Sequence, residues 1–472
     1  MRETVTRAMT NSRHGRRSTL TTSLLASAAV FGLIGAPANA TPDPLAPTQW
    51  ALASMRVPQA LARLTQPLSD ATVAVVDTGV DLTNPDLAPR LWQSPAGTLR
   101  PDGQGELSAG SAGWDFVGQD ATPSPERFSG NDAGSYFDHG TKIAGILGAA
   151  SGNGIGVSGV APNARIMAIR TCTSGPAGCI GSLTANGMAW AATAGARVVN
   201  VSVGGSTPDP LEAAAVQAHP ETLFIVSAGN EGRDIDRAGA AHWPCSQPEP
   251  NVICVASTDQ DDRLSESSNY GVTSVDIAAP GVDIATTVVG GTGAGTGTSE
   301  ATPQVAGVAT LLLGAMPDAT ATEVRDAILT SARPVSSLAG KVASGGVVDA
   351  EGALLRLAAI RRLPAPVCPA GAACEIRASV SGRPDERTAP TITSTKRFVR
   401  GGHRWLAITL RAGSAPTTWR VAAGAAGTPL RIGRIAAGRG VVTTSVPLPA
   451  RSAHTQFTVT ATSTAGTARR FG

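Results

Sequence analysis

Ala71-Thr72-Val73-Ala74-Val75-Val76-Asp77-Thr78-Gly79 is an apolar run that ends in an aspartate followed by a turn. Such a run is typical of a strand buried on both faces of a parallel sheet. A carboxylate at the end of a buried strand costs free energy unless it has a partner. We therefore expect Asp77 to pair with a residue from elsewhere in the chain; the alternative is an aspartate that only stabilises the turn.

The same alternation of apolar runs and Ala-rich helical patterns continues to about residue 350. It predicts a doubly wound, mostly parallel sheet with helices on both faces. The predicted strands are Thr72–Val76, Arg165–Ile169, Arg197–Val203, Leu223–Ser227 and Val252–Ala256. The predicted helices are Ser182–Ala194, Leu211–Ala218, Gln304–Leu313 and Ala321–Ser331. Ligands bind beyond the carboxyl ends of such strands, where Asp77 and Asn230 are expected.

Two further short segments carry residues suited to acyl transfer. His139 begins HGTKIAG, and Ser299 lies in GTSEATP, after a Gly-rich stretch and before an apolar run. A serine hydroxyl needs a base to become a nucleophile, and the base needs a third group to orient it. Ser299, His139 and Asp77 could fill these roles; the alternatives are a helix-capping serine and an ordinary histidine.

The three segments VAVVDTGVD, HGTKIAG and GTSEATPQVAG resemble the signatures of subtilisin-like serine proteases, in that family's order of Asp, His and Ser. The resemblance covers about residues 42–355 and implies a triad of Asp77, His139 and Ser299. It also implies that the amide of Asn230 stabilises the oxyanion. Lys142 departs from the family pattern, which has a second histidine there.

The resemblance further implies that an extended substrate pairs with the segment Ser202, Val203, Gly204 and Gly205, and that Ala228 and Gly229 help to form the pocket for the residue before the cleaved bond. Glu231, with His242 and Trp243 at the pocket base, is expected to influence the charge preference of this pocket. No cofactor is needed for the chemistry. Asp86 and Asn153 resemble ligands of a structural calcium site, and a Gly-rich turn without metal is the alternative.

The first 40 residues have the pattern of a signal peptide. Arginines precede an apolar run, and Ala38-Asn39-Ala40 resembles a cleavage site. We expect export by the Sec route, with a twin-arginine route suggested only by Arg16-Arg17 and a membrane anchor as the other interpretation. The mature protein is then extracellular and carries no transmembrane anchor.

The six cysteines form three locally spaced pairs, which predict disulfides in an oxidising compartment. Six cysteines allow fifteen pairings, so pairing by proximity is an assumption. The pairs are Cys172 with Cys179, Cys245 with Cys254, and Cys368 with Cys374.

Charge divides the chain after the predicted catalytic domain, residues 41–360. That domain has 16 basic and 31 acidic residues, whereas residues 361–472 have 17 basic and 3 acidic residues. We interpret residues 361–388 as a linker and 389–472 as a basic β-sandwich of immunoglobulin type, because short alternating runs are separated by Gly/Pro turns. We expect this domain to contact an anionic cell-envelope surface, with acidic protein substrates or the acidic catalytic domain as the alternatives, and not nucleic acid, for which no motif is present.

The sequence thus predicts a monomeric, secreted serine endopeptidase that acts on proteins or peptides. An inactive surface-binding or scaffold protein with the same fold is the alternative. The sequence is less consistent with a serine esterase, because Ser299 does not lie in a Gly-x-Ser-x-Gly motif.

Overall fold

The computed structural model describes residues 41–127, 137–174 and 178–361 with their side chains, and the backbone of seven strands after residue 390. The predicted signal peptide and the Cys368/Cys374 pair lie outside the described residues.

A nine-stranded sheet forms the centre of the catalytic unit, in the order β10-β11-β7-β6-β5-β4-β1-β3-β2. All neighbours are parallel except β10 and β11. The strands of this sheet are β1 (Ala71–Asp77), β2 (Gly113–Asp115), β3 (Ala164–Arg170), β4 (Val198–Val201), β5 (Leu223–Ser227), β6 (Val252–Thr258), β7 (Ile277–Pro280), β10 (Arg333–Pro334) and β11 (Gly346–Val347). A separate antiparallel hairpin is formed by β8 (Ile284–Val288) and β9 (Gly291–Gly295).

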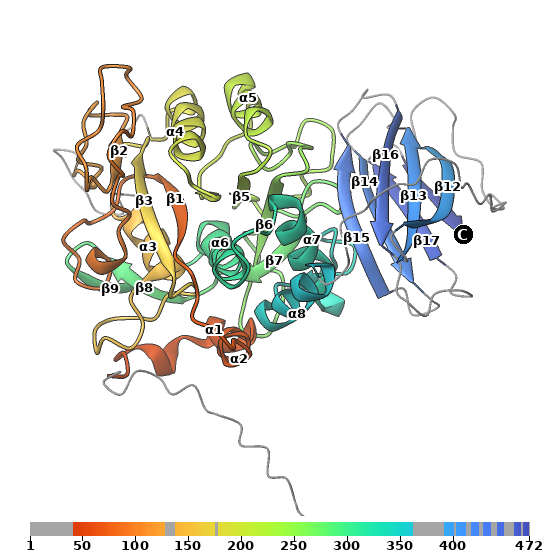
Figure 1. The fold of residues 1–472 in the computed structure, drawn as a ribbon, viewed down its shortest axis with the longest axis horizontal. Coiled ribbons are helices and arrows are strands. Elements are labelled where there is room, and N and C mark those ends of the chain that lie inside the picture. The colour runs from red at the N-terminus through yellow and green to blue at the C-terminus, as the bar shows by residue number, and fades with distance from the viewer. Residues whose placement is uncertain are drawn as a thin grey trace, which may run out of the picture. The chain divides into compact units, whose positions relative to one another are not determined.

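Helices cover both faces of the sheet: α4 and α5 lie on one side, and α6, α7 and α8 on the other (Figure 1). The helices are α1 (Trp50–Ser54), α2 (Val57–Ala62), α3 (His139–Gly148), α4 (Gly181–Thr193), α5 (Pro210–Ala218), α6 (Thr298–Ala315), α7 (Ala321–Ser331) and α8 (Ala350–Arg361). Short 3-10 turns occupy Ala46–Thr48, Ala88–Arg90 and Ser336–Leu338. The predicted doubly wound, mostly parallel fold is confirmed.

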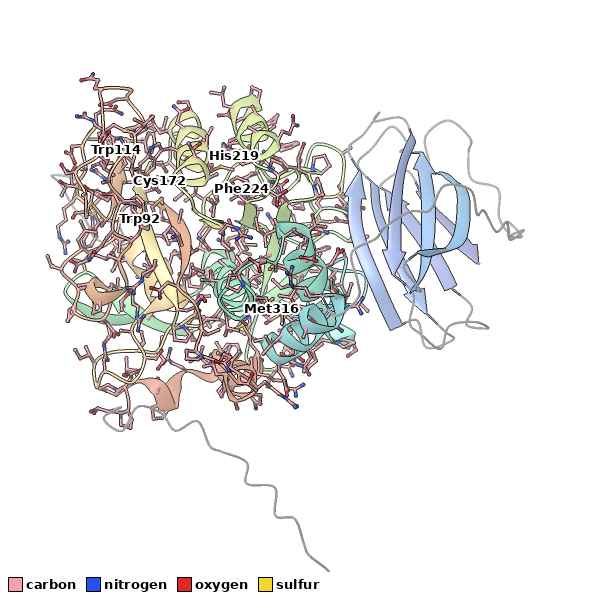
Figure 2. The ribbon with its side chains drawn as sticks, viewed as in Figure 1. Trp92, Trp114, Cys172, His219, Phe224 and Met316 are labelled. Carbon is pink, nitrogen blue, oxygen red and sulfur yellow. A yellow bond between two sulfur atoms is a disulfide. The ribbon has the colours of Figure 1, made fainter. Side chains whose placement is uncertain are left out.

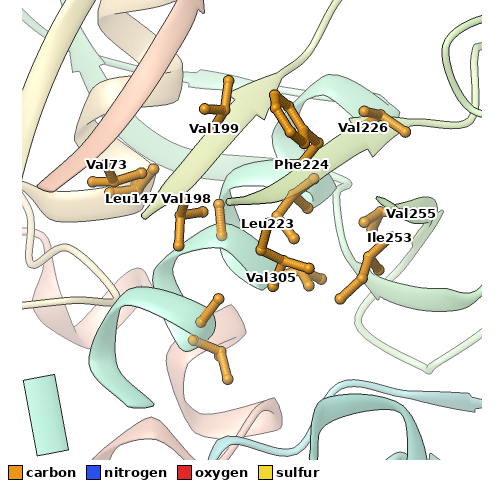
Figure 3. Close-up of a cluster of buried hydrophobic side chains, with 14 of the residues drawn as sticks. Val73, Leu147, Val198, Val199, Leu223, Phe224, Val226, Ile253, Val255 and Val305 are labelled. Carbon is orange, nitrogen blue, oxygen red and sulfur yellow. The ribbon is translucent and has the colours of Figure 1, made fainter. Parts of the chain in front are cut away.

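The hydrophobic core forms where the strands meet these helices. Figure 3 shows side chains of β1, β4, β5 and β6 gathered with Leu147 of α3 and Val305 of α6. Every residue of β5 is buried, as its continuous apolar run predicts. At the β2 end of the sheet, Trp114 is buried where β2 pairs with the carboxyl end of β3, and Trp92 is buried where its N–H donates to the Ile166 carbonyl of β3 (Figure 2).

The residues that follow the predicted cleavage site belong to this core. Met55, Val57 and Ala60 of the α1–α2 region are buried in it, and the Ala350 N–H donates to the Met55 carbonyl at 2.8 Å. The segment from residue 50 to 62 is therefore an integral part of the catalytic unit.

Most predicted elements differ from the observed ones by one or two residues at an end, and two differences affect the site. The strand predicted at Arg197–Val203 ends at Val201, because the next residues leave the sheet and Gly205 pairs with Trp243 instead. The helix predicted at Gln304–Leu313 begins earlier, at Thr298, and contains Pro303.

The strands after residue 390 form two antiparallel sheets, β12-β13-β16 and β15-β14-β17-β18. Their bounds are β12 (Thr391–Arg400), β13 (His403–Arg411), β14 (Thr417–Ala423), β15 (Thr428–Ile435), β16 (Val441–Pro447), β17 (Phe457–Ser463) and β18 (Gly466–Phe471). A β-sandwich of immunoglobulin type remains a prediction for this region.

Candidate active site

Asp77 and His139 are brought together by β1 and α3. Asp77 is the last residue of β1, His139 is the first of α3, and His139 Nδ1 lies 2.8 Å from Asp77 Oδ1 and 2.9 Å from Oδ2. Asp77 Oδ1 also accepts the Thr78 N–H at 2.7 Å. The buried carboxylate thus has the partner that its position at the strand end predicts.

A glycine allows this approach of helix to strand. A Cβ on Gly140 would lie 2.3 Å from the Gly79 carbonyl oxygen and 3.0 Å from the Asp77 Cβ. Any larger residue at position 140 would push α3 away from β1. Gly140 therefore sets the distance at which the imidazole meets the carboxylate.

Ser299 is the second residue of α6 and lies beside an unusual break in helical hydrogen bonding. Pro303 has no N–H, so the Ser299 carbonyl lacks the donor that residue i+4 normally supplies. The Ser202 hydroxyl donates to this carbonyl at 2.9 Å, while the Ser299 hydroxyl donates to the Ser202 carbonyl at 3.0 Å. Asn200 Nδ2 in turn donates to the Ser202 hydroxyl at 3.0 Å. These reciprocal contacts fix the backbone of Ser299 against the end of β4.

Asn230 follows β5 and is oriented by the first residue of α6. Its Oδ1 accepts the Thr298 N–H at 2.8 Å and the Thr298 hydroxyl at 3.0 Å. With the oxygen held in this way, the Nδ2 group is available to donate into the cleft. The N–H groups of the first helical turn, Ser299 among them, have no acceptor inside the helix, so this end of α6 can also receive an anion.

These side chains line one cleft of about 520 Å³. Its walls include the predicted catalytic residues His139, Ser299 and Asn230, together with the predicted binding residues Ser202, Val203, Gly204 and Gly229. Ala228 does not line the cleft: it is fully buried, and its carbonyl accepts Asn269 Nδ2 at 2.8 Å.

The imidazole of His139 is biased toward its protonated form. Burial opposes protonation, but the charge and the hydrogen bond of Asp77 outweigh it and raise the pKa of His139, with a further contribution from the Glu300 carboxylate. Glu300 directly follows Ser299 and is only 5% exposed. Burial raises the pKa of Glu300 as well, although His139 acts in the opposite direction.

The base of the cleft combines a carboxylate with a buried imidazole. Glu231 and His242 both line it, and His242 Nδ1 lies 3.6 Å from Glu231 Oε2. Burial lowers the pKa of His242 despite this carboxylate. Trp243, predicted beside His242 at the same base, lines a neighbouring cavity instead.

Two of the three predicted disulfides are present. Cys172 is bonded to Cys179, and Cys245 to Cys254. Cys179 lines the cleft, so the first disulfide holds part of the cleft wall in place.

The loop that resembles a calcium site brings together Asp86, Asn153 and a second carboxylate, Asp43, whose charge acts on Asp86. Asn153 Nδ2 donates to Asp86 Oδ1 at 2.9 Å, and the Val157 N–H donates to Oδ2 at 2.9 Å. Burial, with a smaller effect of Asp43, raises the pKa of Asp86. Buried carboxylates, an amide oxygen and loop carbonyls are ligands that suit Ca²⁺.

Within residues 41–127, 137–174 and 178–361, no group of three or more His, Cys, Asp or Glu side chains is arranged to hold a metal ion. A calcium ion at this loop would therefore depend on Asp86, the Asn153 amide and backbone carbonyls. The site stays a prediction.

Three contributors to the site were not identified from the sequence: Thr298, Glu300 and the hydroxyl of Ser202. The first two flank Ser299 within GTSEATP, so their proximity to the nucleophile was a readable signal. Their partners, Asn230 and His139, could not be predicted from the sequence, because only folding brings these residues together.

Comparisons with known proteins identify the family of this chain. Residues 69–353 match the Subtilase family. Thermitase from Thermoactinomyces vulgaris is 37% identical over 282 residues, covering 59% of this chain and 87% of thermitase. Subtilisin Savinase from Lederbergia lenta is 33% identical over 308 residues, covering 64% and 97% of the two chains. A protease structure from Pseudoalteromonas arctica aligns with a TM-score of 0.53 and 28% identity over 67% of this chain and 99% of that one.

A parallel sheet with a buried Asp77–His139 hydrogen bond at the end of β1, and a cleft lined by His139 and Ser299, agrees with these matches to serine proteases. The chain belongs to the Subtilase family and is a serine-type endopeptidase.

Proposed function

We propose that the protein is a secreted endopeptidase in which Ser299 is the nucleophile, His139 the general base, Asp77 its orienting partner and Asn230 an oxyanion donor. The observation that carries this proposal is the Asp77–His139 hydrogen bond at a cleft that Ser299 and Asn230 also line. The same four residues stand in the order and context of the family motifs.

In the proposed reaction, the Ser299 hydroxyl turns from the Ser202 carbonyl toward Nε2 of His139. Its oxygen attacks the peptide carbonyl carbon while the imidazole takes its proton. The Asn230 amide and the Ser299 N–H donate to the oxyanion that forms. His139 then protonates the leaving amine, and a water molecule hydrolyses the acyl-enzyme by the same route.

The raised pKa of His139 has a consequence for this mechanism. The base must be neutral to accept a proton, so kcat/KM falls as the pH drops through the pKa of His139. We expect the acid limb of kcat/KM to lie above the ordinary pKa of a histidine, which favours activity at neutral and alkaline pH.

The substrate is a protein or peptide that adds in an extended form to the segment Ser202–Gly205. Glu231 and His242 at the base of the cleft favour a mixed preference for the residue before the cleaved bond, with tolerance of basic side chains. A peptide-library profile with strict selectivity for acidic residues there would contradict this preference.

Secretion, the monomeric state and anchoring are further parts of the proposal. The signal-like residues 1–40 support export, and no helix within the described residues is long and apolar enough to span a bilayer. The basic region 389–472 supports binding to an anionic cell-envelope surface. A distribution between cell wall and medium that does not change with salt would argue against electrostatic anchoring.

The proposed calcium ion would be held by Asp86, Asn153 and loop carbonyls, and would stabilise the loop without taking part in the chemistry. The Asn153 amide would have to turn, because its nitrogen faces Asp86 here.

A fluorophosphonate probe tests the nucleophile directly. We expect the probe to label the wild type and not to label Ser299→Ala. Ser337→Ala is the control and should be labelled, because it removes an exposed hydroxyl that does not line the cleft. A folded wild type that is not labelled would favour the inactive scaffold instead. Labelling of Ser299→Ala would assign the nucleophile elsewhere.

A further inference from the structure

A second cavity, of about 450 Å³, adjoins the catalytic cleft. The two share the lining residues Cys179, Val203 and Gly204. The shared residues include part of the segment along which the substrate is proposed to lie. A peptide bound at Ser299 can therefore continue directly into this cavity, which we name the acidic pocket.

Two carboxylates, Asp209 and Glu212, line the acidic pocket at the start of α5. Asp209 caps the helix, and its Oδ1 accepts the Leu211 N–H at 2.8 Å. Glu212 is 7% exposed, and no hydrogen bond or ion pair to its carboxylate is found among the described residues. Burying a carboxylate without a partner costs free energy, so its retention in the wall of a cavity points to a ligand.

Glu212 has no evident structural role that would explain its burial. It is the third residue of α5, where a glutamate can bond back to the capping residue, yet only the Asp209 side-chain contact is formed at this helix start. Burial, followed by the charge of Asp209, raises the pKa of Glu212 to about 7. A cation in the pocket would relieve both effects, because it would favour the ionised form.

The opposite wall of the pocket leaves room for such a cation. Gly181 begins α4, and a Cβ there would lie 2.8 Å from Asp209 Oδ2. The glycine keeps this carboxylate oxygen accessible from the cavity. Among the residues that the structure describes, no lysine, arginine or histidine lines the acidic pocket.

We propose that the acidic pocket binds a lysine or arginine side chain of the substrate, on the amino-terminal side of the cleaved bond and beyond the residue that fills the catalytic cleft. The inference rests on the proposed endopeptidase function and specifies its substrate class. A side chain is favoured over a metal ion because two carboxylates without a third His, Cys, Asp or Glu make a poor metal site. The pocket is assigned to residues before the cleaved bond because the Ser202–Gly205 segment, with which we expect those residues to pair, leads from Ser299 to the pocket.

The test compares peptides that carry arginine or citrulline at the second, third or fourth position before the cleaved bond. The two side chains have nearly the same shape but differ in charge. Charge-assisted hydrogen bonds predict that kcat/KM is about 10- to 100-fold higher for arginine at one of these positions. A peptide with glutamate at that same position should be cleaved more slowly than a peptide with glutamine there.

Glu212→Gln should reduce the ratio of kcat/KM for the arginine peptide to kcat/KM for the citrulline peptide to within a few-fold of one. Asp209→Asn, which can still cap α5, should reduce this ratio partly. Glu221→Gln is the matched control, because it removes one exposed carboxylate that lines neither cavity and should keep the wild-type ratio. Each variant serves as its own reference, since both peptides are measured on the same enzyme after active-site titration with the fluorophosphonate.

The outcomes separate the two levels of the proposal. Efficient cleavage without any preference for arginine would overturn the acidic pocket and leave the endopeptidase function intact. A preference that persists in both Glu212→Gln and Asp209→Asn would also overturn it. Failure of the wild type to react with the probe or to cleave any peptide would overturn the proposed function, and the acidic pocket with it.

Discussion

Replacing Asn230 by alanine separates oxyanion stabilisation from substrate binding. The amide donates to charge that exists only in the transition state, so its loss should lower kcat and leave KM nearly unchanged. In subtilisin, loss of such a donor lowers kcat by about 10²–10³, or about 2.7–4 kcal/mol, and we transfer that magnitude to this chain. The assay is the hydrolysis of a chromogenic peptide, with kcat and KM determined separately.

The structure adds a second effect and a control. Asn230→Ala also leaves the Thr298 N–H and hydroxyl without their acceptor, which should cost about 1–3 kcal/mol of stability. Asn230→Asp keeps the acceptor for Thr298 but removes the donor, so it should lose activity while retaining more of the wild-type thermal stability. A kcat within about threefold of wild type for Asn230→Ala, in a folded enzyme titrated with the probe, would refute the oxyanion role.

Three other predictions follow from charges in the structure. Glu300→Gln should move the acid limb of kcat/KM to lower pH, because the Glu300 carboxylate raises the pKa of His139; a limb that stays in place would contradict this coupling. Arg325→Ala should lower the free energy of unfolding by about 3–5 kcal/mol, because it leaves Asp276 buried without the ion pair at 2.9 Å. The midpoint of thermal unfolding should fall strongly as a result. Arg263→Ala, which breaks an exposed pair, should cost at most about 1 kcal/mol, and similar midpoints for both variants would show the buried pair to be unimportant. A calcium chelator should lower the same midpoint, since an ion that binds only the folded state stabilises it; an unchanged midpoint would exclude the calcium site.

The sequence predicted the sheet and the main catalytic residues because their signals are local. The run before Asp77 has the composition of a buried strand wherever it occurs, and it forms β1. His139 begins α3 and Ser299 lies in the first turn of α6, as their Gly-flanked motifs indicated. The pocket wall was harder to predict, because the end of β4 depends on whether residues beyond Val201 find partners in the sheet or outside it.

By itself, then, the sequence determined the fold class and the Asp, His and Ser motifs, and it suggested two disulfide pairs by their spacing, since each depends on residues close together in the chain. Only the tertiary structure decided what surrounds them. Ser202 reaches the Ser299 carbonyl across 97 positions of sequence, and Thr298 holds Asn230 across 68. The acidic pocket around Glu212 likewise exists only where α4, α5 and the end of β4 converge. Contacts of this kind depend on how separate elements pack, which no local pattern of residues specifies.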